Sequence, residues 1–176
     1  SAAIFPNDTE AAMTTFPIAT FDLREGGRIG VCPLPGRVGG LEADLKSIVA
    51  WQPAVVLSMT EWGEMKAIGS DVLGARLQDH GIDWVHFPIH DFGGPLGADR
   101  EAWPGLAVRL HGLLDTGHGV LFHCRAGQGR AGMMALRVMV ERGADPDAAL
   151  VGLRRKRPGA VETREQFTWA AEGRSS

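Results

Sequence analysis

The sequence predicts a single-domain α/β fold with a central, mostly parallel sheet flanked by helices. Short β-rich apolar runs alternate with amphipathic stretches along most of the chain, which is the pattern of such a fold. The 176 residues, of which 44% are hydrophobic, suffice for one sizeable core but are few for two domains. No repeat or low-complexity tract interrupts the alternation.

Residues 1–15 mix Pro, Asn, Asp and Thr without periodicity, which predicts an extended N-terminal lead-in before a domain at residues 16–176. In the first half of this domain, apolar runs predict strands, and apolar residues spaced by three or four predict helices. In order, the elements are strands at residues 16–23 and 28–32, a helix from residue 41, a strand at 54–59, a helix at 71–80 and a strand at 82–89.

The second half begins with the strongest helical pattern of the chain. Residues 103–114 carry apolar side chains at helical spacing, and the pattern ends near residue 117. Residues 119–123 form a short apolar run, as expected of a buried strand, and residues 132–141 are apolar on nearly every side. A helix with that composition belongs in the middle of the domain. Helices at residues 145–155 and 163–171 complete the alternation.

The composition limits the classes of partner and cofactor. A formal net charge of −3 provides no basic surface for nucleic acid or anionic membrane. No apolar run approaches the roughly 18 residues of a membrane span, and the first residues lack the apolar core of a signal peptide. Two distant cysteines, Cys32 and Cys124, do not form a disulfide framework and favour a reduced, cytoplasmic location. The six His are scattered, so we expect neither a metal nor another cofactor.

The segment at residues 123–132, His-Cys-Arg-Ala-Gly-Gln-Gly-Arg-Ala-Gly, joins a predicted buried strand to a predicted buried helix. Ligands of open parallel sheets bind outside the carboxyl ends of the strands, where this segment lies. Its three glycines allow the backbone to curl so that successive N–H groups point into one concave site at a helix N-terminus. The sequence therefore predicts an anion-binding loop.

Cys124 and Arg130 would supply the chemistry of this loop. The field of the amides favours the thiolate, which would make Cys124 a nucleophile, and Arg130 could bind two oxygens of a phosphate. Phosphoryl transfer depends mainly on positioning and charge neutralisation, which amides and one Arg can supply. The alternative is a structural turn with a buried cysteine. The pattern has a chance occurrence on the order of one in ten thousand in this composition, which favours catalysis.

This loop resembles the active-site loop of the cysteine-dependent protein tyrosine phosphatase superfamily, in which His-Cys is followed by five residues and Arg. Residues 32–36, 87–95 and 159–166 resemble its dual-specificity branch, and within that branch the kinase-associated phosphatase, or cyclin-dependent kinase inhibitor, type. The resemblance extends over residues 26–172. It implies a protein tyrosine phosphatase-like fold of the dual-specificity type. It also implies hydrolysis of phosphotyrosine, phosphoserine or phosphothreonine in proteins through a phosphocysteine intermediate.

The resemblance assigns roles to further residues. Asp91, on a loop rich in Gly and Pro, matches the general acid that protonates the leaving group, although a turn Asp making local hydrogen bonds is an alternative. Gln166 matches a glutamine that positions the attacking water, while Glu162 replaces the other glutamine of that pair. The phosphate-binding loop would consist of His123, Arg125, Ala126, Gly127, Gln128, Gly129 and Ala131, together with the two catalytic residues.

Two features leave other functions open. Ala131 replaces a Ser or Thr whose hydroxyl usually stabilises the departing cysteine sulfur, which predicts slow breakdown of the phosphoenzyme or a catalytically weak phosphate-binding module. Arg125 resembles a basic residue of lipid phosphatases, so a phosphoinositide substrate is an alternative to a phosphorylated protein or peptide. An Arg that is merely solvated is the other interpretation of this residue. A rhodanese-like sulfurtransferase also uses a cysteine in a strand-to-helix loop and remains a further alternative.

Overall fold

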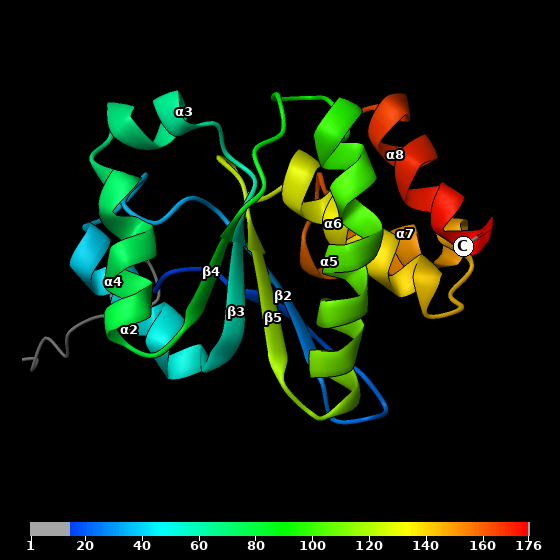
Figure 1. The fold of residues 1–176 in the computed structure, drawn as a ribbon, viewed down its shortest axis with the longest axis horizontal. Coiled ribbons are helices and arrows are strands. Elements are labelled where there is room, and N and C mark those ends of the chain that lie inside the picture. The colour runs from blue at the N-terminus through cyan, green and yellow to red at the C-terminus, as the bar shows by residue number, and fades with distance from the viewer. Residues whose placement is uncertain (1–14, 176) are drawn as a thin grey trace, which may run out of the picture.

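The structure, a computed structural model, describes residues 15–175 as one five-stranded sheet with helices on both sides (Figure 1). The strands lie in the order β1-β2-β5-β3-β4, and all neighbouring pairs are parallel except β1 with β2. The predicted α/β fold with a mostly parallel sheet is confirmed. The strands are β1 (Ala19–Asp22), β2 (Arg28–Cys32), β3 (Pro53–Ser58), β4 (Asp83–His86) and β5 (Gly119–His123).

The helices form two groups, one on each side of the sheet (Figure 1). The first group packs over a core that includes Ile48, Leu73 and Leu77, and the second over a core that includes Phe122 and Leu136. The first group consists of α2 (Leu41–Trp51), α3 (Trp62–Ala67), η1 (Ser70–Val72) and α4 (Leu73–Asp79). The second consists of α5 (Gly97–Asp115), α6 (Gly129–Glu141), α7 (Pro146–Lys156), α8 (Arg164–Ala171) and η2 (Glu172–Ser175).

β5 and α6 form the centre of the domain. Every residue of β5 is buried, and the strand pairs with β2 on one side and with β3 on the other. Nearly every residue of α6 is buried as well, which confirms the central position predicted from its apolar composition. The helix begins at Gly129, before the predicted start at residue 132, so Arg130 belongs to its first turn. The loop between β5 and α6 is therefore held by the two most buried elements.

Some predicted boundaries were wrong. The strand predicted at residues 82–89 ends at His86, although Phe87 N and Ile89 N still donate to carbonyls of residues 58 and 59. The helix predicted at 71–80 begins as η1 and becomes α-helical only at Leu73. The short helix α3 was not predicted. The lead-in predicted at residues 1–15 lies outside the described residues except for Thr15.

Within residues 15–175, no helix is both long enough and apolar enough to cross a membrane. In the same part of the chain, no group of three or more His, Cys, Asp or Glu side chains is arranged to hold a metal ion.

Candidate active site

Cys124 directly follows the central strand β5, and its side chain is 2% exposed. The chain then turns sharply to enter α6. Gly127 has φ +71°, and a Cβ at this position would come within 2.5 Å of the carbonyl carbon of Cys32. Glycine is thus required here both by the backbone conformation and by the close approach of β2.

The carbonyl groups of residues 125–128 are all bound by groups outside these four residues. In a trans peptide, the N–H of the next residue points opposite to the carbonyl, so the N–H groups of residues 126–129 face away from these partners. Among the described residues, none of these four N–H groups donates a hydrogen bond. They form a concave set of free donors beside Cys124. The bound carbonyls are Arg125 O with Leu34 N (3.1 Å), Ala126 O and Gly127 O with Arg157 Nη2 and Nε (2.5 and 2.8 Å), and Gln128 O with Gly132 N (2.8 Å).

Arg130 is 1% exposed and is held along one edge of its guanidinium group. Nη1 and Nη2 each lie 2.7 Å from a different oxygen of Glu64, and Nη1 also donates to Ile89 O at 3.0 Å. Nε is buried and has no partner among the described residues. Nε is therefore the donor of Arg130 that remains for an anion, on the edge whose Nη2 lies 3.4 Å from Asp91.

The ion pair changes the titration of both partners. Burial raises the pKa of Glu64, but the hydrogen bonds from Arg130 and from Glu61 N, together with the charges of Arg130 and Arg125, outweigh burial and lower the pKa below its usual value. Burial lowers the pKa of Arg130, but the hydrogen bond from Glu64 and the charge of Cys124 raise it overall. Both residues are thus charged at neutral pH, and the orientation of Arg130 is fixed by a carboxylate that the motif does not contain.

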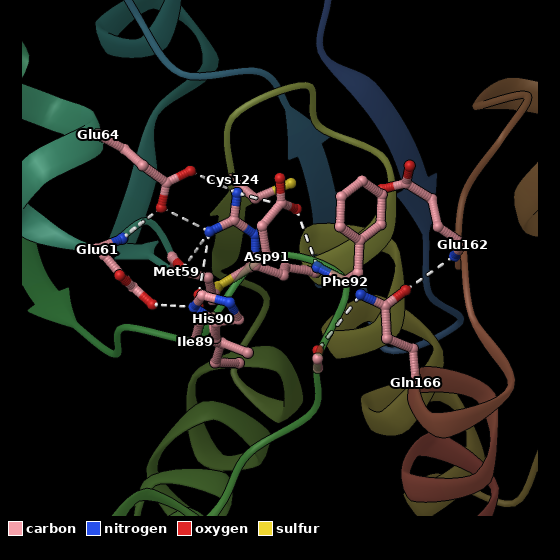
Figure 2. Close-up of polar contacts among 12 residues, drawn as sticks. Met59, Glu61, Glu64, Ile89, His90, Asp91, Phe92, Cys124, Glu162 and Gln166 are labelled. Atoms are coloured by element: carbon pink, nitrogen blue, oxygen red, sulfur yellow. Dashed lines mark hydrogen bonds and ion pairs between the residues drawn. The ribbon is translucent and has the colours of Figure 1, made fainter. Parts of the chain in front are cut away.

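Asp91 lies on the exposed loop between β4 and α5, and its Oδ1 is 3.4 Å from Arg130 Nη2 (Figure 2). The same oxygen accepts a hydrogen bond from Phe92 N at 3.0 Å. Phe92 has φ +66°, a left-handed conformation that is unfavourable for an aromatic residue. Because Cys124 also acts electrostatically on Arg130, the thiol, the guanidinium and the carboxyl group share one site.

The N-cap and first turn of α8 hold this loop in place, and Figure 2 shows the side chain of Gln166 directed toward it. Thr163 Oγ1 donates to Phe92 O at 2.9 Å, and Gln166 Nε2 donates to Gly93 O at 3.3 Å. Gln166 is fully buried, and its Oε1 accepts from the backbone N–H groups of Glu162 and Thr163. The structure thus gives Gln166 a role in fixing the Asp91 loop, while its predicted role toward water stays a prediction.

Both departures from the family pattern lie beside the loop. Ala131 is fully buried in the first turn of α6, directly after Arg130. The carboxylate of the exposed Glu162 lies against Gly129, where any Cβ would collide with its Oε1. A negative charge therefore approaches the N-terminus of α6, where the family usually places a neutral amide.

His123 and Cys32 lie next to the loop, paired at the ends of β5 and β2. His123 is fully buried, with Nε2 bonded to Ser58 Oγ and Nδ1 3.3 Å from Cys124 O. Burial lowers the pKa of His123 to about 4, so the imidazole is neutral near pH 7. Cys32 ends β2 opposite His123, and burial together with the charge of Cys124 raises the pKa of its thiol.

Sequence reasoning missed Glu64 and Arg157. Glu64 belongs to a capping box at the start of α3, in which Glu61 and Glu64 bond each other's backbone N–H groups. The spacing Glu-x-x-Glu could have indicated this helix start, but not the contact with Arg130. Arg157 lies in a basic stretch at the end of α7, and no local pattern distinguishes it from its neighbours.

No family model matches the chain. Protein tyrosine phosphatase type IVA 3 from Bos taurus is 33% identical over 91 residues, which is 52% of this chain and 52% of that protein. The same protein from Homo sapiens is 33% identical over 89 residues, or 51% of each chain. The chain thus spans about half the length of the curated relatives it matches.

The fold is shared with solved phosphatase structures. Kinase associated phosphatase, in a form with its catalytic cysteine replaced by serine, matches with a TM-score of 0.78 and 24% identity over 91% of this chain and 94% of that one. Tk-PTP in its active form matches with a TM-score of 0.67 and 27% identity over 89% and 97%. PTPMT1 in complex with PI(5)P matches with a TM-score of 0.66 and 16% identity over 89% and 95%.

The fold is that of protein tyrosine phosphatase-like proteins. The chain is related in sequence and fold to the cysteine-dependent protein tyrosine phosphatase superfamily, as predicted from residues 123–132.

Proposed function

We propose that residues 16–176 form a catalytic domain that hydrolyses phosphate monoesters on phosphorylated Tyr, Ser or Thr side chains of proteins. The observation that carries this proposal is a set of donors beside Cys124 that have no partner within residues 15–175: the N–H groups of residues 126–129 and Nε of Arg130. A buried donor without a partner costs about 1–3 kcal/mol, and a bound phosphate dianion would satisfy several such donors at once.

In the first step, the sulfur of Cys124 attacks phosphorus and forms a P–S bond while the P–O bond to the substrate side chain breaks. Asp91 gives its proton to the departing oxygen. The amides and Arg130 stabilise the charge on the transferred group, which is the main catalytic requirement of phosphoryl transfer. The ion pair with Glu64 supports this role because it fixes the free edge of Arg130 before the substrate binds.

In the second step, water attacks phosphorus, Asp91 accepts a proton from the water, and the P–S bond breaks to restore the thiolate and release phosphate. Gln166 would position both the Asp91 loop, through Gly93 O, and the attacking water. Ala131 offers no hydroxyl to the departing sulfur, which makes this step the slower one.

The proposed setting follows from the same features. The free thiols of Cys32 and Cys124 suit a reduced compartment such as the cytoplasm. The loop would also bind phosphate-like anions such as sulfate or vanadate, and no nucleic acid is expected as a partner at a formal charge of −3. Phosphoinositide hydrolysis is the second candidate, supported by the exposed Arg125 next to Cys124.

The test compares p-nitrophenyl phosphate and phosphopeptides as substrates for the wild type and its variants. Cys124→Ser should abolish turnover, Asp91→Asn should lower kcat by about a hundredfold, and the control Cys32→Ser should retain activity. Acid quenching should trap phosphate on the wild type but not on Cys124→Ser. Turnover by Cys124→Ser would exclude the nucleophile, and sulfur transfer from thiosulfate without phosphatase activity would identify a sulfurtransferase instead.

A further inference from the structure

A cavity of about 820 Å³ adjoins the candidate active site on the side of α3. It shares two wall residues with that site: Glu64, which holds Arg130, and Arg125, which follows Cys124. Its remaining walls come from residues 34–38 and from α3 and the residue after it. A substrate whose phosphate enters the loop therefore has its adjacent groups next to this cavity.

Two cations line the cavity, and the carboxylate of Glu64 acts electrostatically on one of them, Arg125. Arg37 and Arg125 are both exposed, and neither guanidinium group forms an ion pair or hydrogen bond with any of the described residues. The carboxylate of Glu64 is the opposing charge, but both of its oxygens are bound by Arg130. The cavity is thus locally positive in a chain whose formal net charge is −3.

The segment that carries Arg37 is fixed relative to the catalytic loop. Leu34 N donates to Arg125 O at 3.1 Å, and Gly36 N donates to the buried carboxylate of Asp44 at 2.8 Å. Ser70 Oγ bonds Pro35 O. These contacts fix the backbone of residues 34–36 next to the catalytic loop, and Arg37 extends from this fixed segment into the cavity wall.

The apolar part of the wall indicates the kind of molecule that fits. Leu34, Val38 and Ile68 line the same cavity as the two cations, and Val38 is 87% exposed. A polyhydroxylated sugar headgroup would gain nothing from these side chains, whereas a peptide could cover them with its own apolar atoms. The negative net charge also opposes adsorption to an anionic membrane surface. The walls therefore suit a peptide better than a lipid headgroup.

We propose that this cavity is a second anion subsite, in which Arg37 and Arg125 bind an acidic or phosphorylated side chain close in sequence to the phosphoresidue of a peptide substrate. The proposal rests on the proposed phosphatase function and names its preferred substrate: a phosphopeptide with a second negative group. The apolar wall would pack against the residues between the two groups.

The kinetic test compares p-nitrophenyl phosphate, a singly phosphorylated peptide with neutral neighbours, and the same peptide with a second phosphorylated residue. Arg37→Ala should lower kcat/KM for the doubly phosphorylated peptide by about tenfold and leave the other two substrates unchanged. Arg24→Ala is the matched control, since Arg24 is exposed in the β1–β2 turn. Equal kcat/KM of the wild type for both peptides, or an equal loss for both in Arg37→Ala, would refute the subsite.

Binding to Cys124→Ser separates this proposal from the proposed function, because it needs no turnover. The doubly phosphorylated peptide should bind about tenfold tighter than the singly phosphorylated one, and the difference should vanish in Cys124→Ser/Arg37→Ala and shrink with added salt. Tighter binding without turnover by the wild type would refute the phosphatase function but keep the subsite. If the affinity for a soluble short-chain phosphoinositide fell in the Arg37→Ala variant while the affinity for both peptides did not, the preferred ligand would be a phosphoinositide and not a peptide.

Discussion

Arg130 and Glu64 form a two-point ion pair, in which each terminal guanidinium nitrogen lies 2.7 Å from a different carboxylate oxygen. The pair joins the first turn of α6 to α3, two elements on opposite sides of the sheet (Figure 1). Arg130 belongs to the motif, whereas Glu64 is 66 residues away in sequence. The orientation of the phosphate-binding edge therefore depends on the packing of a helix that the motif does not specify.

Glu64→Gln should weaken the site through this contact. We expect kcat/KM for p-nitrophenyl phosphate to fall about tenfold, because a neutral amide holds Arg130 less firmly and the free Nε edge loses its direction. The free energy of unfolding should fall by about 2 kcal/mol, less than for a fully buried pair because Glu64 is 22% exposed. Glu42→Gln, which alters an exposed ion pair with Arg76, is the control and should change neither quantity measurably. Unchanged kinetics in Glu64→Gln would show that the carbonyls of residues 59 and 89 suffice to orient Arg130.

Arg157→Ala should lower the affinity of the loop for anions. Arg157 binds the carbonyl groups of residues 126 and 127, and without it these carbonyls are free to turn inward and repel an anion. We expect the dissociation constant for vanadate or tungstate, measured by calorimetry, to rise about tenfold. The dissociation constant of Arg157→Lys should lie between those of the wild type and Arg157→Ala, since an ammonium group lacks the planar fork of a guanidinium group. Arg155 is exposed in the last turn of α7, which Arg157 follows, so Arg155→Ala should bind vanadate or tungstate as the wild type does.

Gln166→Ala should release the Asp91 loop. The side chain makes three hydrogen bonds from a fully buried position, so its loss should cost about 2–3 kcal/mol in the free energy of unfolding. If the main effect is misplacement of Asp91, kcat should fall more for phenyl phosphate, whose leaving group needs the proton, than for p-nitrophenyl phosphate. Thr168→Ala, exposed on the same helix, is the control. An equal loss with both substrates would contradict a role through Asp91.

Ala131→Ser should accelerate breakdown of the phosphoenzyme. The wild type is expected to show a burst of product followed by slow turnover, and the added hydroxyl, placed next to Arg130, should remove the burst and raise the steady-state rate. Ala135→Ser introduces the same group one turn later on the buried face of α6 and should leave the burst unchanged. The idea fails if Ala131→Ser turns over at or below the wild-type rate.

The stability of the fold should depend on pH through His123. Its pKa is lowered from 6.5 to about 4, so the unfolded chain takes up a proton below pH 6.5 that the folded chain does not. The free energy of unfolding should therefore be highest above pH 6.5 and fall by about 3 kcal/mol between pH 6.5 and 4. The pKa values of Glu64 and Glu141 are lowered in the folded protein. Protonation of these carboxylates therefore reduces the free energy of unfolding further, but only below about pH 4.5. Denaturant titrations across this range, compared with His123→Gln, should show a flatter curve for the variant; equal slopes would contradict the assignment.

The parts of the site that were predictable are those that the chain specifies locally. Cys124 and Arg130 are separated by one loop and one helical turn, so their spacing alone brings them together. The order of β5 and α6 followed from apolar composition in the same way. Glu64 and Arg157 could not be predicted, because their contacts depend on the packing of α3 and of the end of α7 against the loop. The length of β4 was overestimated because the apolar residues Phe87 and Ile89 are buried without belonging to a regular strand.

Cys124 and Asp91 are attached to the fold in different ways. The thiol continues a strand that is paired on both sides, whereas the carboxyl group belongs to a segment that side chains of α8 and Arg130 hold. On heating, the Asp91 loop should detach at a lower temperature than β5 and Cys124. The hydrogen bonds of β5 break only when the whole sheet opens. In that partly opened state, the loop at Cys124 would still bind phosphate, but Asp91 would no longer be in place to donate a proton. Under the proposed function, warming would therefore abolish catalysis while phosphate binding persists, before the whole domain unfolds.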